Sequence, residues 1–280
     1  MKTELYTITT LTNLHVGSGD ANFDIIDNQV QRNAITTLPN INSSSLKGAF
    51  REHFTQFDAN GMISYIFGPE STSDDNHQTG AYSFFEAKLL TRPVRSNAKY
   101  FFNATSPAVI SEFLQSCELF KVPLDSEFKN ALQKLSELKP NKPFIFEDTK
   151  TTVYLEDSEA SFYQFDTTKF TSFLGKDLAL FSDSEFKNLA LPVLARNKLD
   201  NGESKNLWYE EIVPKEAKFY FFIAKPENLD SNDKAQKIEG FERRFDNEEI
   251  IQIGANKSIG YGFCKVAQIK NGGVKWAKKG

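Results

Sequence analysis

Residues 11–51 constrain the fold of this chain most, because their character changes several times within one short stretch. A strand-like run breaks at HVGSG, an acidic stretch and an extended Gln/Arg stretch follow, and a helical pattern closes the stretch. Three serines at 43–45 stand directly before the apolar residues of that pattern, and we expect one of them to be the helix N-cap. Such a stretch predicts a strand and a helix joined by a long loop that is itself functional.

The start of this helix has the composition of a phosphate-binding site. Ser44 and Lys47 lie in or beside its first turn, and Arg51 follows one turn after Lys47 on the same face. The free N–H groups at a helix N-terminus attract anions. Residues 28–51 contain no Asp or Glu, whereas the segment just before them is acidic. The sequence therefore places carboxylates next to a predicted phosphate site.

Charge is distributed unevenly along the chain, although the formal net charge is only −4. Three windows, 28–51, 87–111 and 250–280, contain no acidic residue and hold 13 of the 33 basic residues. An anion-binding surface on an otherwise acidic protein has this distribution. A solvated basic tail is the alternative interpretation.

Composition limits the class of protein. A chain of 280 residues fits one large domain or two small ones, and 26 phenylalanines predict a core rich in Phe. Two isolated cysteines and three histidines argue against a zinc site or a disulfide framework and favour a reducing cytoplasm. The sequence shows neither a signal peptide nor an apolar run long enough to cross a bilayer, so we expect no membrane partner.

The order of the expected elements favours an α+β fold over a parallel βαβ series. Strands are predicted near 3–13, 81–90, 219–224, 250–254 and 261–269, helices near 45–57, 107–120, 126–138 and 232–245, a loop at 69–80, and a hairpin at 191–213 that turns at 200–202. A ferredoxin-like sheet with inserted subdomains accommodates this order.

Several motifs occur in a fixed order along the chain. They are HVGSG at 15–19, DNQVQRN at 27–33, SSLKGAFR at 44–51, RPVRS at 92–96, LPVLARN and NLWYEEIVP within 191–214, and IGANKSIGYGF at 253–263. The last is neither a dinucleotide-binding loop nor a P-loop, and it is weak when taken alone. Together the motifs resemble the RAMP superfamily of CRISPR proteins, and most closely the repeated backbone subunit of the type III-B (Cmr) effector complex. Residues 110–185 carry no motif that can be placed.

The resemblance implies one RAMP domain over residues 1–280 with a modified ferredoxin-like (RRM-like) palm. The palm would comprise about 1–60, 81–105 and 214–280, with an inserted loop at 61–80, a helical or irregular finger insertion at 106–190 and a thumb hairpin at 191–213. In this family copies stack along a guide (CRISPR) RNA together with other Cmr subunits, and a target RNA is cut at regular intervals. The thumb would wedge between the RNA strands and displace a nucleotide.

The resemblance also implies roles for individual residues. Asp27 matches the cleavage residue, which in this family works with Mg²⁺ or another divalent cation, and Lys47 would grip guide phosphates. The expected RNA-binding residues are Lys47, Arg51, Ser44, Arg32, Arg92, Arg95, Gly254, Lys257, Gly260 and Gly262. The family's double glycine in the last loop is Gly254-Ala255 here.

The chemistry of RNA cleavage leaves alternatives for these residues. Attack by a 2′-hydroxyl needs in-line geometry, a proton acceptor and stabilisation of the developing charge. An aspartate with the ordinary pKa of about 4 is a poor base at neutral pH, so Asp27 is expected to hold the metal or to orient the hydroxyl. His15 is either a proton carrier or a hydrogen-bonded structural histidine. Asp24 is either a further metal ligand or a solvent-facing residue.

The hairpin carries four further candidates. Adjacent residues on a strand point to opposite faces, so at most one of Glu210 and Glu211 is expected to enter a site. Trp208 or Tyr209 is expected either to stack on a base or to pack in the core.

Three other functions compete with the target-cleaving subunit. A non-catalytic guide-RNA scaffold would leave target RNA whole in Mg²⁺, and a guide-processing endoribonuclease of the same superfamily would cut repeat RNA in EDTA, using His15. A plain α+β domain with glycine hairpins remains only if the order of the motifs is coincidental.

Overall fold

The computed structural model describes residues 1–19, 25–58, 61–69, 79–227 and 232–270. Asp20, Asp24 and most of the predicted loop 69–80 lie outside these residues. No described helix is long and apolar enough to cross a membrane. Cys117 and Cys264 are both free and buried.

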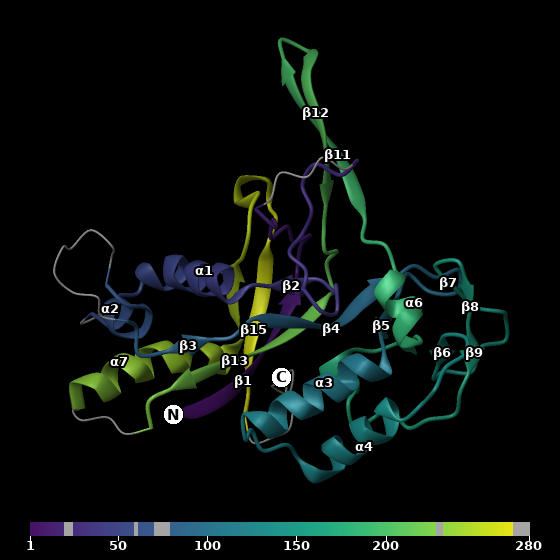
Figure 1. The fold of residues 1–280 in the computed structure, drawn as a ribbon, viewed down its shortest axis with the longest axis horizontal. Helices are drawn as coiled ribbons and strands as arrows, with labels where there is room; N and C mark the ends of the chain where they lie inside the picture. The colour runs from purple at the N-terminus through teal and green to yellow at the C-terminus, as the bar shows by residue number, and fades with distance from the viewer. Residues whose placement is uncertain (20–24, 59–60, 70–78, 228–231, 271–280) are drawn as a thin grey trace.

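A mixed sheet runs through the described part of the molecule (Figure 1). Its order is β14-β15-β1-β13-β4-β5-β10-β6-β9, and β2 and β3 pair with β4 and β13 outside that path. The strands are β1 (Lys2–Thr10), β2 (Asn40–Ile41), β3 (Ser83–Phe84), β4 (Ala87–Val94), β5 (Phe102–Thr105), β6 (Phe144–Ile145), β9 (Ser161–Phe162), β10 (Leu178–Leu180), β13 (Lys218–Lys225), β14 (Glu249–Gln252) and β15 (Phe263–Ile269). The expected α+β fold is confirmed.

Four of the helices in the described part of the chain correspond to the four predicted ones, and three short helices were not predicted. The helices are α1 (Ser43–Thr55), α2 (Met62–Phe67), α3 (Pro107–Leu119), α4 (Ser126–Ser136), α5 (Thr171–Leu174), α6 (Asp183–Asn188) and α7 (Asn232–Glu242), with 3₁₀ turns η1 (Arg243–Asn247) and η2 (Lys257–Ile259). The N-cap of α1 is Asn42, so the prediction of a serine cap was wrong. The Gln31 side chain accepts a hydrogen bond from the N–H of Asn42 and thereby fixes the backbone there. The helix consequently begins directly after Asn42, at the first of the three serines.

Helices pack on both faces of the centre of the sheet, and phenylalanines fill both interfaces. On one face Phe50 of α1 packs edge-to-face on Phe221 of β13. On the other, Phe113 of α3 packs edge-to-face on Tyr220. Successive residues of a strand alternate between faces, so an unbroken apolar run such as β13 is required when both are covered. The predicted Phe-rich core is confirmed, since ten of the twelve largest fully buried side chains are Phe.

The region 106–190 contributes strands as well as helices. β10 pairs parallel with β5 and antiparallel with β6, so this region extends the central sheet. A small separate ladder joins β7 (Tyr154–Leu155) to β8 (Ser158–Glu159).

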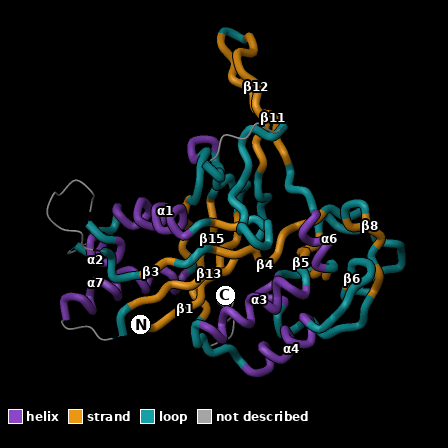
Figure 2. The backbone as a smooth tube through the Cα atoms, viewed as in Figure 1, coloured by secondary structure: helices purple, strands orange, loops and turns teal. Residues whose placement is uncertain are grey.

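A two-stranded hairpin stands out from the body of the molecule (Figures 1 and 2). It consists of β11 (Val193–Asp200) and β12 (Glu203–Glu211), which pair only with each other among the described strands. Asn201 and Gly202 form its turn with φ of 50° and 85°. Two positive φ angles are what a tight hairpin turn demands, so the predicted turn is confirmed.

Candidate nucleic-acid interface

Asp27 lies at the point where β12 returns to the body, which we call the hairpin root (residues 209–211). Its Oδ2 accepts a hydrogen bond of 2.7 Å from the N–H of Tyr209. The next residue continues the contact, because Asn28 donates to the Tyr209 carbonyl at 3.1 Å and accepts from the Glu211 N–H at 2.9 Å. Asp27 is exposed. The main chain of the hairpin thus fixes a carboxylate at the surface.

Glu211 fastens the segment after Asp27 to the hairpin root. Its side chain is 7% exposed, and its Oε1 lies 2.5 Å from a guanidinium nitrogen of Arg32. Its Oε2 accepts from the N–H of Val30 at 3.1 Å. Arg32, an expected RNA-binding residue, also donates to the Thr37 carbonyl. The positive charge of Arg32 is therefore largely neutralised by Glu211 within the protein.

Glu210 points the other way, as expected for its neighbour on a strand. It is 4% exposed and accepts from Arg196 at 3.0 Å and from the Asn256 amide at 2.9 Å. Arg196 also stacks over the ring of Tyr261, with its guanidinium carbon 4.7 Å from the ring centre. This glutamate thereby joins both strands of the hairpin to the glycine-rich loop that contains Asn256 and Tyr261.

His15 is buried, and its Nδ1 lies 2.7 Å from the carbonyl oxygen of Glu211. A carbonyl only accepts, so Nδ1 carries the proton in this contact. The backbone carbonyl of His15 accepts from the Ala255 N–H at 2.9 Å. These contacts match the structural alternative for His15, and its expected part in catalysis stays a prediction.

The three glycines of the last loop divide into two kinds. A Cβ added at Gly254 would lie 2.3 Å from the His15 carbonyl oxygen, and one at Gly262 would lie 2.0 Å from that of Ile253. Both glycines are therefore required by neighbouring protein backbone. At Gly260 an added Cβ would meet no atom within 4 Å, which leaves this glycine open to a ligand.

Gln31 connects the Asp27 segment to the start of α1. Its Nε2 donates to the Ser45 hydroxyl at 3.0 Å and to the Gly17 carbonyl at 3.2 Å, and its Oε1 accepts from the Asn42 N–H at 2.7 Å. Four residues of extended chain span at most roughly 14 Å, which bounds the distance between the Cα atoms of Asp27 and Gln31. Gln31 therefore links the segment that carries Asp27 to the start of α1, and the expected closeness of Asp27 to bound phosphate stays a prediction.

The first turn of α1 carries the features of an anion site. It contains no acidic residue and its N-cap makes no side-chain capping bond. Ser44 is exposed, and within the described part of the chain Lys47 forms no ion pair closer than 4 Å. Arg51 has a buried Nη2 without a protein partner there. Lys257, by contrast, pairs with Glu52 at 3.0 Å on the surface.

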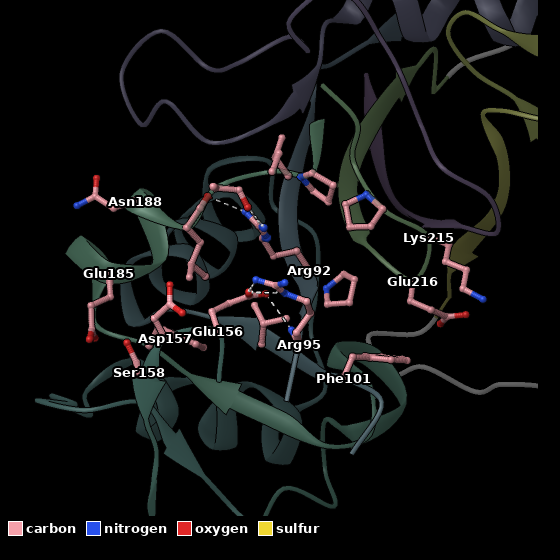
Figure 3. Close-up of a pocket in the computed structure, with 18 of the residues that line it drawn as sticks. Arg92, Arg95, Phe101, Glu156, Asp157, Ser158, Glu185, Asn188, Lys215 and Glu216 are labelled. Atoms are coloured by element: carbon pink, nitrogen blue, oxygen red, sulfur yellow. Dashed lines mark hydrogen bonds and ion pairs between the residues drawn. The ribbon is translucent and has the colours of Figure 1, made fainter. Parts of the chain in front are cut away.

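Arg92 and Arg95, which line the cavity in Figure 3, bond to other segments than Asp27 does, although Arg92 lies near enough to Arg32 and Glu211 for their charges to act on it. Arg92 is 4% exposed and donates to the carbonyls of Leu189 and Ala190, in the segment that enters the hairpin, whereas Asp27 contacts the strand that leaves it. Burial lowers the pKa of Arg92 to about 10. Arg95 forms an ion pair of 2.7 Å with Glu156. Arg92 thus lies near the Arg32–Glu211 pair, but among the described residues neither arginine bonds to Asp27, and contact of both with RNA stays a prediction.

A divalent cation would find few free ligands. Among the described residues no three His, Cys, Asp or Glu side chains form a group suited to a metal. Glu210 and Glu211 are committed to protein donors, so Asp27 supplies the free carboxylate oxygen of this interface. Mg²⁺ commonly keeps several waters and takes one or two carboxylates. These residues therefore fit a hydrated Mg²⁺ held chiefly by waters and phosphates.

Comparison with known proteins decides the family. The model of the RAMP superfamily matches residues 7–265. The chain belongs to this superfamily. This RAMP protein is 29% identical to the CRISPR system Cmr endoribonuclease Cmr4 of Pyrococcus furiosus over 303 residues, covering 99% of this chain and 100% of the relative.

Solved structures agree on the RAMP fold. A chain of the type III-B Cmr-beta complex bound to cognate target RNA superposes with a TM-score of 0.79 at 22% identity, covering 96% of this chain and 97% of that one. Oligomeric Cmr4 from Pyrococcus furiosus gives 0.72 at 25% identity, with 96% and 98% covered.

Sequence reasoning missed the residues that hold the interface together. It gave Gln31 no role and treated Glu210 and Glu211 only as candidates for the site. The available signal was their adjacency on one strand, with Arg196 on the partner strand able to reach Glu210 diagonally. That signal does not reveal Arg32 or Asn256, which are brought in by the fold.

Proposed function

We propose that this RAMP protein is the repeated backbone subunit of a type III-B CRISPR effector complex, which binds guide RNA and cuts target RNA at regular intervals. The observation that carries the proposal is an exposed carboxylate, Asp27, which is fixed at the hairpin root and linked through Gln31 to a helix N-terminus whose Lys47 forms no ion pair among the described residues. The likeness to an endoribonuclease along the whole chain supports it.

The contacts of Asp27 and His15 are better suited to positioning the attacking 2′-hydroxyl than to proton transfer by a histidine. One oxygen of Asp27 is held by the Tyr209 N–H, which leaves the other to accept a hydrogen bond from the attacking 2′-hydroxyl and to set its direction. Lys47 and the N–H groups of α1 would hold backbone phosphates nearby. A hydrated Mg²⁺ on Asp27 would supply stabilisation of the developing negative charge.

We assign His15 a positioning role. Its Nδ1 is occupied by the carbonyl of Glu211, and its Nε2 faces Gly17, where an added Cβ would lie 3.3 Å away. A buried imidazole in this setting orients the hairpin root on which Asp27 depends. This favours target cleavage over the alternative of guide processing by a histidine acid/base mechanism.

The proposed partners are guide RNA, target RNA, further copies of this chain and other subunits of a Cmr complex. Relatives of this chain include an oligomeric Cmr4 and a Cmr-beta subunit in a complex bound to target RNA. Because both cysteines are free thiols, we place the protein in a reducing compartment, the cytoplasm.

The test is cleavage of an end-labelled target RNA by the reconstituted complex in millimolar Mg²⁺. The expected result is a ladder of evenly spaced products that EDTA abolishes. Asp27→Asn should abolish the ladder with guide binding retained, while Asp148→Asn, at an exposed position outside the hairpin, should leave it unchanged. Intact target with the unmodified protein would establish the non-catalytic scaffold instead, and a ladder of full strength in EDTA would refute the metal.

A further inference from the structure

Two of the three acid-free windows of the sequence meet in the structure. The window 28–51 ends just before Glu52 on α1, and the window 250–280 begins just after Glu249 on β14. Each of these bordering acids contacts the other stretch, because the Lys257 ammonium lies 3.0 Å from Glu52 and the Nε2 of His53 lies 2.7 Å from Glu249. In Figure 1 the loop that joins β14 to β15, drawn in yellow, stands beside α1.

Glu52 differs in charge from its surroundings. It is the single acidic residue of α1 (Ser43–Thr55), and Lys257 is the single basic residue between positions 250 and 264. Glu52 directly follows Arg51 in the sequence and pairs with Lys257, and both of these cations are expected RNA-binding residues. The one carboxylate of this helix therefore neutralises a cation of the expected RNA-binding surface.

The position of α1 does not depend on the Glu52–Lys257 pair. Buried contacts hold this part of the helix, since the ring of Phe54 packs with its centre 4.6 Å from that of Phe241. The side chains of Lys257 and Glu52 are 61% and 70% exposed. Ion pairs between such exposed groups stabilise a fold little. Another anion can therefore take the place of Glu52 at little cost to the fold.

The helix surface next to Glu52 is open to a ligand. Gly48 is exposed and lies one turn before Glu52 on the same side of α1, where an added Cβ would meet no atom of another part of the described chain within 4 Å. Glycine inside a helix destabilises it relative to alanine, and no packing contact requires a glycine here. Close approach of a ligand accounts for it. Residues four apart on a helix are neighbours, so a ligand over Gly48 reaches the Glu52–Lys257 pair.

We propose that Glu52 is an exchangeable counter-ion of Lys257, which holds the ammonium in the free protein and is replaced there by a phosphate of bound RNA. A phosphate fits because, like a carboxylate, it offers charged acceptor oxygens to an ammonium. The inference rests on the proposed function and adds to it a residue that sets RNA affinity. An RNA that makes few other contacts gains little by displacing Glu52, so the pair suppresses weak, non-specific binding.

Glu52→Gln tests the exchange in the full-length protein, by titration with fluorescein-labelled guide RNA. Lys257 is then free before RNA arrives, so affinity should rise about 2- to 5-fold, the factor that corresponds to an exposed ion pair. The slope of log affinity against log salt should steepen by up to about 0.7, because no carboxylate has to take up a cation when RNA binds. Glu118→Gln is the matched control, since it removes the same charge from an exposed position on α3, across the sheet from α1, and should change neither quantity.

Lys257 distinguishes exchange from simple repulsion of RNA by Glu52. Lys257→Gln should weaken guide binding, and in that background Glu52→Gln should raise affinity less than ~1.5-fold, because no ammonium is left to release. An equal gain with and without Lys257 would overturn the exchange. A loss of affinity in Glu52→Gln alone, which a purely structural pair would give, would overturn it as well.

Gly48→Gln tests whether RNA passes beside Glu52. Glutamine favours the helix more than glycine does, so the urea midpoint should stay or rise, whereas guide affinity should fall at least ~3-fold because the side chain occupies the open surface. Opposite changes in stability and affinity separate a ligand contact from damage to the fold. Undiminished affinity would show that RNA does not cross α1 at this point and would overturn the proposal.

The outcomes also separate this inference from the proposed function. If the unmodified protein and its reconstituted complex bind no guide RNA, both are overturned. Guide binding and target cleavage that Glu52→Gln leaves unchanged would overturn the exchange alone. A gain in guide affinity without target cleavage by the complex would support the exchange and leave the chain a non-catalytic RNA scaffold.

Discussion

Glu211→Gln tests whether the hairpin root positions Asp27. The carboxylate of Glu211 receives two donors, the guanidinium of Arg32 at 2.5 Å and the N–H of Val30 at 3.1 Å. An amide of the same shape has one accepting oxygen, and its NH₂ group must face one of these donors. The substitution therefore removes one buried, charge-assisted hydrogen bond and leaves a donor facing a donor.

The magnitude follows from these contacts. A hydrogen bond to a charged group contributes about 1.5–3 kcal/mol. Arg32 is a third exposed, which lowers the effect of its pairing, so about 2 kcal/mol is expected. Since about 1.4 kcal/mol corresponds to a factor of ten, the segment that carries Asp27 should leave its position about 10- to 30-fold more often. Target cleavage should slow by up to the same factor if it needs the docked segment.

Single-turnover cleavage by the reconstituted complex measures the effect, with guide affinity determined in parallel. Guide affinity should change less than about 3-fold, because α1 keeps its sequence and its Gln31 contact. Glu127→Gln is the matched control, since that side chain lies outside the hairpin, is 69% exposed and pairs with Lys169. Unchanged cleavage by Glu211→Gln, or equal loss of cleavage and guide binding, would refute a positioning role.

Three further outcomes are expected. Lys47→Ala should weaken guide RNA binding and lower the slope of log affinity against log salt by about one unit, as titrations at several salt concentrations would show. Burial lowers the pKa of Lys218 from 10.5 to about 8. Its charged form therefore lowers the free energy of unfolding by the full amount below about pH 8, and this destabilisation disappears as the pH rises to 10.5. Lys218→Met should therefore flatten the rise of unfolding free energy over that range, by up to about 3 kcal/mol, and an unchanged urea-unfolding profile contradicts this. Gly262→Ala should lower the free energy of unfolding by well over 1 kcal/mol and Gly260→Ala by only about 1 kcal/mol. Both glycines have positive φ, but only at Gly262 would an added Cβ lie against the Ile253 carbonyl. Equal urea midpoints for the two variants would show that the backbone relaxes around the Cβ.

Local patterns in the sequence predicted the parts of the fold that depend on local rules. The Asn201-Gly202 turn fixed the hairpin, and the unbroken apolar run of β13 indicated a strand buried on both faces. The sequence also indicated that the Asp27 segment and the start of α1 belong to one functional stretch, which agrees with their link through Gln31.

Properties that depend on distant partners were not predictable. Arg32 and Glu211 are 179 residues apart, so the sequence around Arg32 does not indicate that its guanidinium is paired with a carboxylate. The basic RPVRS motif was expected to contact RNA. Arg92 is buried, however, because the segment entering the hairpin covers it and accepts its hydrogen bond. Gly254 was expected to let the loop approach the RNA backbone, whereas the contact that the structure shows at its Cβ position is with the backbone of His15.

Glu210 and Glu211 are consecutive on β12 and grip different loops, one through Asn256 and the other through Val30 and Arg32. Both glutamates stand at the base of the hairpin, where it joins the body. We therefore expect a molecule that displaces the hairpin strands to move the Asp27 segment and the glycine-rich loop with them.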